Sequence, residues 1–370
     1  MNNAVSISII FSVALLLQIP KLSAAGGGSS KRGGAEECNL FQGIWVRDAA
    51  GDYPLYNEST CPFIQPEFNC QKNGRIDRGY LGYRWEPLGA SCSLARFNAS
   101  FFMSNVMRGR TMMFVGDSLS RNQWQSLLCI IHSSLPTATY TTSFQGSTTI
   151  YTFPHYENAR IMLDRNVFLV DVVSEKTGRV LKLDSIEAGK RWLGADYLIF
   201  NTWHWWNRRG PSQPWDFIQV GRELVKDMDR TAAFGLALTT WAAWVESNID
   251  PAKTLVFYQG ISPSHYNGSE WGEPGVTSCG KEHQPLLGPT YPGGLPPALA
   301  LLKNILANIR GVPVHFLDIT NLSLLRKDGH PSIYGLDGRL DCSHWCLAGV
   351  PDTWNVILYN ILLENWQLLR

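Results

Sequence analysis

Ser118 stands where a buried strand gives way to a helix, a place at which a hydroxyl can do chemistry. Residues 112–115 form a short apolar run, and Gly116 after them permits a sharp turn. The apolar positions of residues 119–131 then recur at roughly the spacing of one helix face. Backbone N–H groups at a helix start can receive negative charge that develops beside the serine. Ser118 is therefore a candidate nucleophile, and a simple helix cap is the alternative.

Asp341 and His344 would complete the set of groups that activates a serine. An acid and a histidine three residues apart can face the same way on one turn of chain. If the fold brings them to Ser118, His344 takes the proton of the attacking hydroxyl, while Asp341 orients the ring and stabilises the imidazolium. Asp117 adjoins the serine, but neighbouring side chains point in different directions, so we assign it to the turn. The three residues together predict acyl transfer through serine.

The other histidines are interpreted as core or loop residues. They are His132, His155, His204, His265, His283, His315 and His330. His204 is the most open to another role, because it lies in a tryptophan cluster close to Asn201.

The elements expected along the chain would carry these residues to one edge of a sheet. Further strands are predicted at residues 167–173, 195–200, 254–258 and 314–317, and further helices at 217–248 (with a break near Gly235), 299–309 and 354–369. Strands that alternate with helices indicate an α/β fold, a parallel sheet covered on both faces in three α/β/α layers. The polar segment 133–149 is expected to contribute no core element. Ser118, Asn201 and residues 341–344 each follow a strand, and sites in such sheets form beyond the carboxyl ends of the strands.

Longer motifs extend this pattern over most of the chain. They are residues 114–124 (FVGDSLSRNQW), the Asp341-x-x-His344 pair, residues 38–46 (CNLFQGIWV), and shorter matches at 54–56, 61–64, 73–75, 83–85 and 96–98. In this order, from about Cys38 almost to the carboxyl end, they resemble the plant trichome birefringence-like family. That family belongs with the GDSL/SGNH-type esterases and includes O-acetyltransferases of cell-wall polysaccharides. The resemblance implies an SGNH-like catalytic domain at residues 111–370, packed as one unit with an irregular, cysteine- and tryptophan-rich lobe at 38–110.

The resemblance also implies an oxyanion hole. The Ser118 backbone N–H and the Asn201 side-chain amide would meet the oxyanion, with the backbone N–H of Gly146 as a third donor. Each such donor typically stabilises the transition state by ~3 kcal/mol.

Arg121 and the tryptophans near Asn201 are the predicted substrate-binding residues. The chain has 14 tryptophans, of which Trp203, Trp205 and Trp206 are clustered. Sugar rings have apolar faces that stack on such side chains, although a large buried core would use them equally well. No bound cofactor and no metal ion are expected, but a transferase would need an acetyl donor as co-substrate.

The cysteines form an even set of 8, which indicates disulfides in an exported protein. They are Cys38, Cys61, Cys70, Cys92, Cys129, Cys279, Cys342 and Cys346. The close pairs lack the C-x2-C spacing of structural zinc sites. The resemblance implies four bridges, in which Cys342 and Cys346, on either side of His344, are each tied to a distant cysteine. The Asn-x-Ser sequons at Asn57, Asn98, Asn267 and Asn321 are predicted glycosylation sites.

The first residues have the composition of a targeting segment. Residues 4–17 are mostly apolar and small residues follow at 23–25, so residues 1–25 are predicted to be a signal peptide or an uncleaved signal anchor. Residues 26–37 are expected to be a flexible linker. The protein should therefore enter the secretory pathway and reach the Golgi lumen or the cell wall. With 32 basic and 31 acidic residues, nothing indicates a nucleic-acid partner, and membrane contact is expected only through the possible anchor.

The expected partner is a cell-wall polysaccharide, and the expected activity is O-acetyl transfer to xylan, mannan or pectin. A pectin or xylan acetylesterase with the same triad is the first alternative, because transfer and hydrolysis differ only in how the acceptor is positioned and water excluded. A non-catalytic protein that binds wall polysaccharide is the second.

Overall fold

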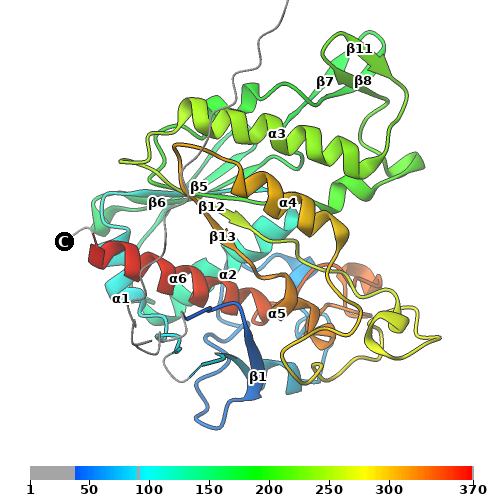
Figure 1. The fold of residues 1–370 in the computed structure, drawn as a ribbon. Coiled ribbons are helices and arrows are strands. Elements are labelled where there is room, and N and C mark those ends of the chain that lie inside the picture. Colours follow the sequence, from blue (N-terminus) through cyan, green and yellow to red (C-terminus); the bar gives the residue numbers. More distant parts are fainter. Residues whose placement is uncertain (1–37, 90–91, 369–370) are drawn as a thin grey trace, which may run out of the picture. The chain divides into compact units, whose positions relative to one another are not determined.

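The computed structural model describes residues 38–89 and 92–368; the signal segment and linker predicted at residues 1–37 lie outside the described residues. The described chain is built on a seven-stranded sheet with the order β13-β12-β9-β3-β6-β5-β4 (Figure 1). Its parallel strands are β3 (Thr111–Gly116), β6 (Ala159–Arg165), β9 (Tyr197–Phe200), β12 (Leu255–Gln259) and β13 (Val314–Leu317). The hairpin of β4 (Thr141–Gln145) and β5 (Thr148–Phe153) adds two antiparallel strands beside β6.

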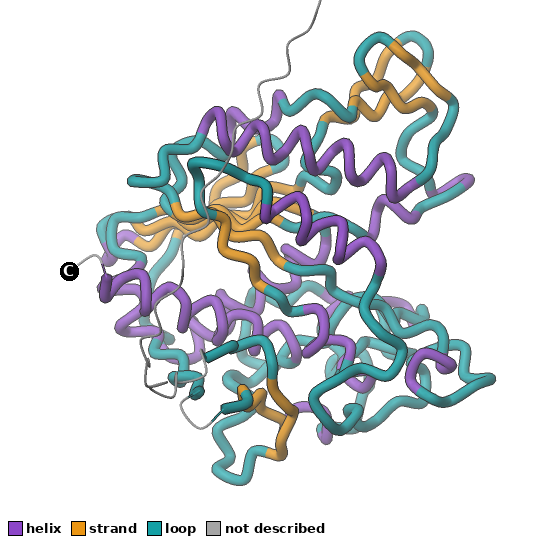
Figure 2. Tube along the Cα trace, in the orientation of Figure 1, coloured by secondary structure: helices purple, strands orange, loops and turns teal. Residues whose placement is uncertain are grey.

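Helices cover both faces of this sheet (Figure 1, Figure 2). On one face, α2 (Ser118–Ser134) and α6 (Val350–Leu368) share a core with Met112 and Phe114 of β3. On the other face, α3 (Arg230–Asn248) and α4 (Pro297–Ala307) share a core with Met113 and Val115. Successive side chains of a strand point to opposite faces, so the buried strand β3 serves both cores. The predicted three-layer α/β/α architecture is confirmed. The short helices α1 (Ala99–Phe101) and α5 (Thr320–Leu324) add Ala99, Leu322 and Leu324 to the core that α2 and α6 share.

The polar segment at residues 133–149 was expected to contribute no core element, and this prediction is wrong in part: β4 is exposed at the edge of the sheet, but Thr148 is buried. The segment contains β4 and the start of β5. Thr148 and Ile150 are buried against the rest of the sheet while Thr149 between them is not, which is the alternation of a strand. Threonine fits a half-buried pleated surface, so the polarity of the segment does not exclude a strand.

A second, four-stranded sheet includes part of the strand predicted at 167–173 and the first part of the helix predicted at 217–248. Its order is β11-β10-β8-β7, formed by β7 (Asp171–Glu175), β8 (Gly178–Lys182), β10 (Phe217–Val220) and β11 (Glu223–Val225). The strand predicted at 167–173 thus begins later and in another sheet. The helix predicted from residue 217 begins at Arg230, where Asp229 Oδ1 accepts the Ala232 N–H at 2.9 Å. Gly235 does not break this helix; a side chain there would crowd Leu301 of α4.

The N-terminal lobe has little regular structure besides the antiparallel pair β1 (Gly43–Arg47) and β2 (Tyr83–Pro87). All eight cysteines are paired, as Cys38–Cys92, Cys61–Cys129, Cys70–Cys346 and Cys279–Cys342. The predicted ties of Cys342 and Cys346 to distant cysteines are confirmed. Two of the bridges join the lobe to α2 and to the loop that carries His344. Within residues 38–89 and 92–368, no helix combines the length and apolarity needed to cross a bilayer.

Candidate active site

Ser118 is the first residue of α2 and lies just beyond the carboxyl end of the central strand β3. Asp117 caps the helix, since its Oδ1 accepts the backbone N–H of Leu119 at 2.8 Å. Gly116 is required by crowding, because a Cβ atom there would lie 2.4 Å from both the Asn201 carbonyl oxygen and Ser120 Oγ. The tight turn against the end of β9 therefore fixes where the serine hydroxyl projects.

The structure brings Ser118, His344 and Asp341 together, although 226 residues separate the serine from the histidine. His344 Nε2 lies 2.7 Å from Ser118 Oγ, and His344 Nδ1 lies 2.6 Å from Asp341 Oδ2. Both contacts have hydrogen-bond length, so an N–H at Nδ1 facing the carboxylate leaves Nε2 free to accept the serine proton. The His344 side chain is 25% exposed, so the serine can be reached from solvent.

Asp341 is held as a carboxylate by a dense set of donors. Its Oδ1 accepts the Ser343 N–H at 3.0 Å, the Ser343 hydroxyl at 2.9 Å and the His344 N–H at 3.1 Å. Burial alone would raise the pKa of Asp341, but the bond from the His344 ring and these backbone donors outweigh it and hold the pKa well below its usual range. The group is thus ionised wherever His344 is a neutral base.

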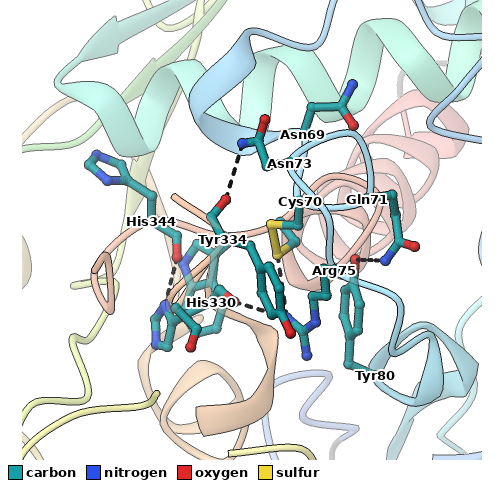
Figure 3. Close-up of a disulfide and its surroundings, with 12 residues drawn as sticks. Asn69, Cys70, Gln71, Asn73, Arg75, Tyr80, His330, Tyr334 and His344 are labelled. Atoms are coloured by element: carbon teal, nitrogen blue, oxygen red, sulfur yellow. Dashed lines mark hydrogen bonds between the residues drawn. A yellow bond between two sulfur atoms is a disulfide. The ribbon is translucent and has the colours of Figure 1, made fainter. Parts of the chain in front are cut away.

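The loop that carries His344 is fastened on both sides. Cys342 is bonded to Cys279, and Cys346 to Cys70 of the lobe (Figure 3). From α2, Asn122 forms two bonds with the backbone of Trp345, accepting its N–H at 2.8 Å and donating to its carbonyl at 3.1 Å. Our sequence analysis missed Asn122. Its spacing of four from Ser118 places both on one helix face, which is the signal that could have found it.

Asn201 follows β9 and lies beside the serine turn. Its Oδ1 accepts the Asp117 N–H at 3.4 Å and the Ser120 hydroxyl at 3.2 Å. In the described part of the chain its Nδ2 makes no hydrogen bond, so this amide is a donor available to a ligand. Gly146 does not join it: the glycine lies in the β4–β5 turn, two strands away from β3, and no bond links it to the triad among the described residues. The expected third donor is corrected accordingly.

The predicted substrate residues differ in exposure. Trp206 is fully buried between Phe168 and Phe234, so it fills the core and cannot contact a glycan. This corrects our assignment of Trp206 to substrate binding. Trp205 is half-buried, with Arg208 stacked on it at 4.1 Å and Arg165 at 6.0 Å from the ring centre.

Three more residues, Arg121, Trp203 and His204, lie near the triad. Arg121 pairs with Glu67 at 2.7 Å and lies over Phe68, whose ring also packs against His344. Trp203 and His204 line a cavity of about 430 Å³ beyond the ends of β9 and β12. Burial lowers the pKa of His204, and its Nε2 lies 2.8 Å from the Ser262 carbonyl, which fits a neutral ring.

Comparisons with known proteins identify the family of the chain. A family model described as the GDSL/SGNH-like acyl-esterase family found in Pmr5 and Cas1p matches residues 94–361, and the PMR5 N terminal domain matches residues 36–93. Protein trichome birefringence-like 41 of Arabidopsis thaliana is 57% identical over 98% of this chain and 99% of its own length. The chain belongs to the trichome birefringence-like family. Trichome birefringence-like 39 of the same plant is 52% identical over 89% of this chain and 88% of its own length. Protein trichome birefringence, also from Arabidopsis thaliana, is 37% identical over 90% of this chain and 57% of its own length.

The boundary between the two family models lies at residues 93 and 94, whereas we had predicted a boundary at residues 110 and 111. Residues 94–361 include Ser118, Asn201, Asp341 and His344, so the acyl-esterase part of this trichome birefringence-like chain holds the whole candidate site.

Of the four sequon asparagines, Asn57, Asn98 and Asn267 are exposed. Asn321 is half-buried and donates through Nδ2 to the Pro289 carbonyl at 2.8 Å. A glycan on Asn321 would break that bond. Modification at any of the four stays a prediction.

Proposed function

We propose that this protein is a serine-dependent O-acetyltransferase that acetylates a plant cell-wall polysaccharide. The observation that carries the proposal is the chain of contacts from Ser118 Oγ through the His344 ring to Asp341. It is the arrangement by which a serine loses its proton as it attacks an ester. The family's description as acyl-esterases supports acyl chemistry at this site.

In the first half-reaction, Ser118 Oγ attacks the acetyl carbonyl of the donor and its proton passes to His344 Nε2. The Ser118 N–H and Asn201 Nδ2 stabilise the oxyanion. The intermediate collapses to acetyl-serine, and the leaving group of the donor takes the proton from His344. In the second half-reaction, a sugar hydroxyl gives its proton to His344 as it attacks, and the acetyl group leaves Ser118, which regains the proton. Asp341 remains a carboxylate throughout.

Binding of the polysaccharide is assigned to the surfaces on either side of Asn201. The 430 Å³ cavity lined by Trp203 and His204 has the size of a small-ligand site and offers an aromatic wall with polar groups. Trp205 presents part of its indole beside two arginines. Arg165 and Arg208 have no carboxylate partner among the described residues. Such uncompensated cations favour an acceptor that carries carboxylates, as pectin does.

We place the protein in the secretory pathway, either in the Golgi lumen or in the cell wall. Its four disulfides support this location, because such bonds persist in oxidising compartments. An acetyl donor is the required co-substrate, and contact with a membrane is assigned only to the N-terminal segment.

The test is transfer of labelled acetyl groups. The full chain would be incubated with a labelled acetyl donor and with oligosaccharides of xylan, mannan or homogalacturonan. The masses of the products would be measured by mass spectrometry. We expect acetylated product from the wild type and none from Ser118→Ala, whose fold the circular dichroism spectrum would check. Full activity of Ser118→Ala would refute the mechanism.

A wall acetylesterase is the second candidate. It is favoured by the family's description and by the partial exposure of His344, which lets water reach an acetyl-serine. Release of acetate from acetylated polymer, without transfer to an added acceptor, would establish the esterase instead. Binding of polysaccharide with neither activity would identify a non-catalytic wall protein.

A further inference from the structure

His265 and His330 form a buried pair directly behind the triad. The two side chains are 0% and 1% exposed, and His265 Nδ1 lies 2.7 Å from His330 Nε2. The outer nitrogens face backbone carbonyls: His265 Nε2 lies 2.8 Å from the Leu324 oxygen, and His330 Nδ1 lies 2.6 Å from the His344 oxygen. Figure 3 shows His330 joined in this way to the backbone of the proposed base.

The number of protons in this chain of contacts follows from its geometry. A carbonyl oxygen only accepts, so both outer nitrogens must carry hydrogen. The central contact between nitrogens also needs one N–H, since two lone pairs at hydrogen-bond distance repel each other. Three N–H groups are therefore required, whereas two neutral imidazoles supply only two. The observed arrangement is that of a pair that holds one proton beyond neutrality.

Opposing effects act on such a proton. Burial lowers the pKa of both rings, that of His265 to about 4, which disfavours a charged pair. All three contacts can be hydrogen bonds at once only in the protonated pair, which favours the first proton, while repulsion excludes a second.

The charges around the pair act on its proton in both directions. The lobe contributes Arg75 and Asp77, and the triad contributes Asp341 and His344. The segment before His330 contributes Arg326, Lys327 and Asp328, and Lys327 is paired with Glu273 and Glu282. The other titratable groups nearby are Tyr266 and Tyr291. Carboxylates outnumber cations in this set. His265 and His344 lower the proton affinity of His330 when they are charged, whereas Asp341 and the bond to the His344 carbonyl raise it.

We propose that His265 and His330 are positioning residues for the His344 base, and that the proton they share holds the His344 backbone in place. The inference rests on the acyl-transfer function proposed above. When the shared proton leaves, one of the three contacts must open, and the bond to the His344 carbonyl is one of them. The ring of His344 must stay within hydrogen-bond reach of Ser118, so a small displacement of its backbone lowers the rate of serine attack.

The first experiment counts protons and needs no activity, so it separates this inference from the proposed function. The wild-type chain with ¹⁵N-labelled histidine would be studied by NMR at the pH at which its fold is most stable, and His265→Gln and His330→Asn would assign the signals. We expect three protonated nitrogens in the pair, with one ring protonated at both positions. Two neutral rings with the fold intact would overturn the proposal.

The second experiment measures kcat and KM across pH for variants of the pair. His330→Leu removes the donor to the His344 carbonyl, and we expect kcat to fall by about tenfold to a hundredfold with KM unchanged. His330→Asn puts an amide near the place of Nδ1 and should recover most of kcat. His315→Gln is the control for loss of a histidine, because His315 is a half-buried residue of β13 whose ring stacks on Phe257 of β12. Equal loss in the Leu and Asn variants would overturn the positioning role.

His265→Gln tests the shared proton itself. Glutamine can still donate to the Leu324 carbonyl, but without Nδ1 at residue 265 the His330 ring needs no extra proton. We expect wild-type kcat to decline as pH rises through the titration seen by NMR, and this decline to be absent in the variant. A pair that titrates without any change in kcat would contradict the inference.

Discussion

Asp352 gives the most quantitative prediction about stability, and the perturbation is Asp352→Asn. The side chain lies in the first turn of α6 and is 2% exposed. Its Oδ1 accepts the Tyr56 hydroxyl at 2.9 Å and the Ser126 hydroxyl at 2.6 Å, and its Oδ2 accepts the Gly349 N–H at 2.9 Å. No cation pairs with it among the described residues. Burial therefore dominates and raises the pKa of Asp352 to about 7.

The magnitude follows from the difference between the folded and unfolded states. The unfolded carboxyl has a pKa near its ordinary value of 3.8, against about 7 in the fold. Between these values the native state binds a proton that the unfolded state has lost, so stability falls as pH rises. The stabilisation is complete below pH 3.8 and is lost as pH rises through about 7. The full change is about 4 kcal/mol. Asparagine has no charge to bury, so its cost is the same at every pH.

The assay is urea unfolding of both proteins at a series of pH values. Other groups also titrate, and burial lowers the pKa of His315, which gives a slope of opposite sign below pH 6.5. The quantity to follow is therefore the difference in unfolding free energy, Asp352→Asn minus wild type. We expect it to rise by about 4 kcal/mol from acid to mildly alkaline pH. Asp337→Asn, at a side chain 72% exposed, controls for loss of one negative charge. A difference that does not change with pH would refute the reasoning.

Three further predictions concern the site. Asp341→Asn removes the charge that orients His344 and should lower kcat on the order of 10⁴-fold with little change in KM; an effect under tenfold would contradict the triad. Asn201→Ala should lower kcat roughly 10²- to 10³-fold, because it removes the free amide beside Ser118; unchanged kcat would exclude Asn201 as an oxyanion donor. Trp205→Ala should raise KM for the polysaccharide about fivefold, from about 1 kcal/mol of lost stacking. Trp244→Ala, on α3 against Trp192, is its control, and equal effects would contradict a role in binding.

The sequence contained enough to predict where the triad meets. Ser118 follows one parallel strand, and Asp341 and His344 lie after the last one, so topology alone brings them to the same edge of the sheet. Burial could not be predicted in this way. Trp205 and Trp206 are neighbours of the same residue type, yet only the second is enclosed by Phe168 and Phe234, which come from other segments.

Contacts between distant segments were equally out of reach. His265 and His330 are 65 residues apart, and each by itself resembles an ordinary core histidine. Gly146 was assigned by analogy with a motif, whereas the hairpin that carries it depends on pairing between β5 and β6. The segment at 217–225 has helix-compatible residues but pairs as strands, because tertiary context decides when propensities are weak.

The N-terminal lobe supports the active site from behind and is not a separate attachment. Arg75 is 3% exposed, and its guanidinium donates to the His330 carbonyl at 2.9 Å (Figure 3). It also donates to the Asp328 carbonyl at 2.8 Å. Five residues before it, Cys70 is bonded to Cys346, two residues after His344. The lobe therefore holds both ends of the segment that presents the base. Separating the lobe would leave two buried carbonyls without donors and free the loop, so the lobe and the acyl-esterase region should unfold together.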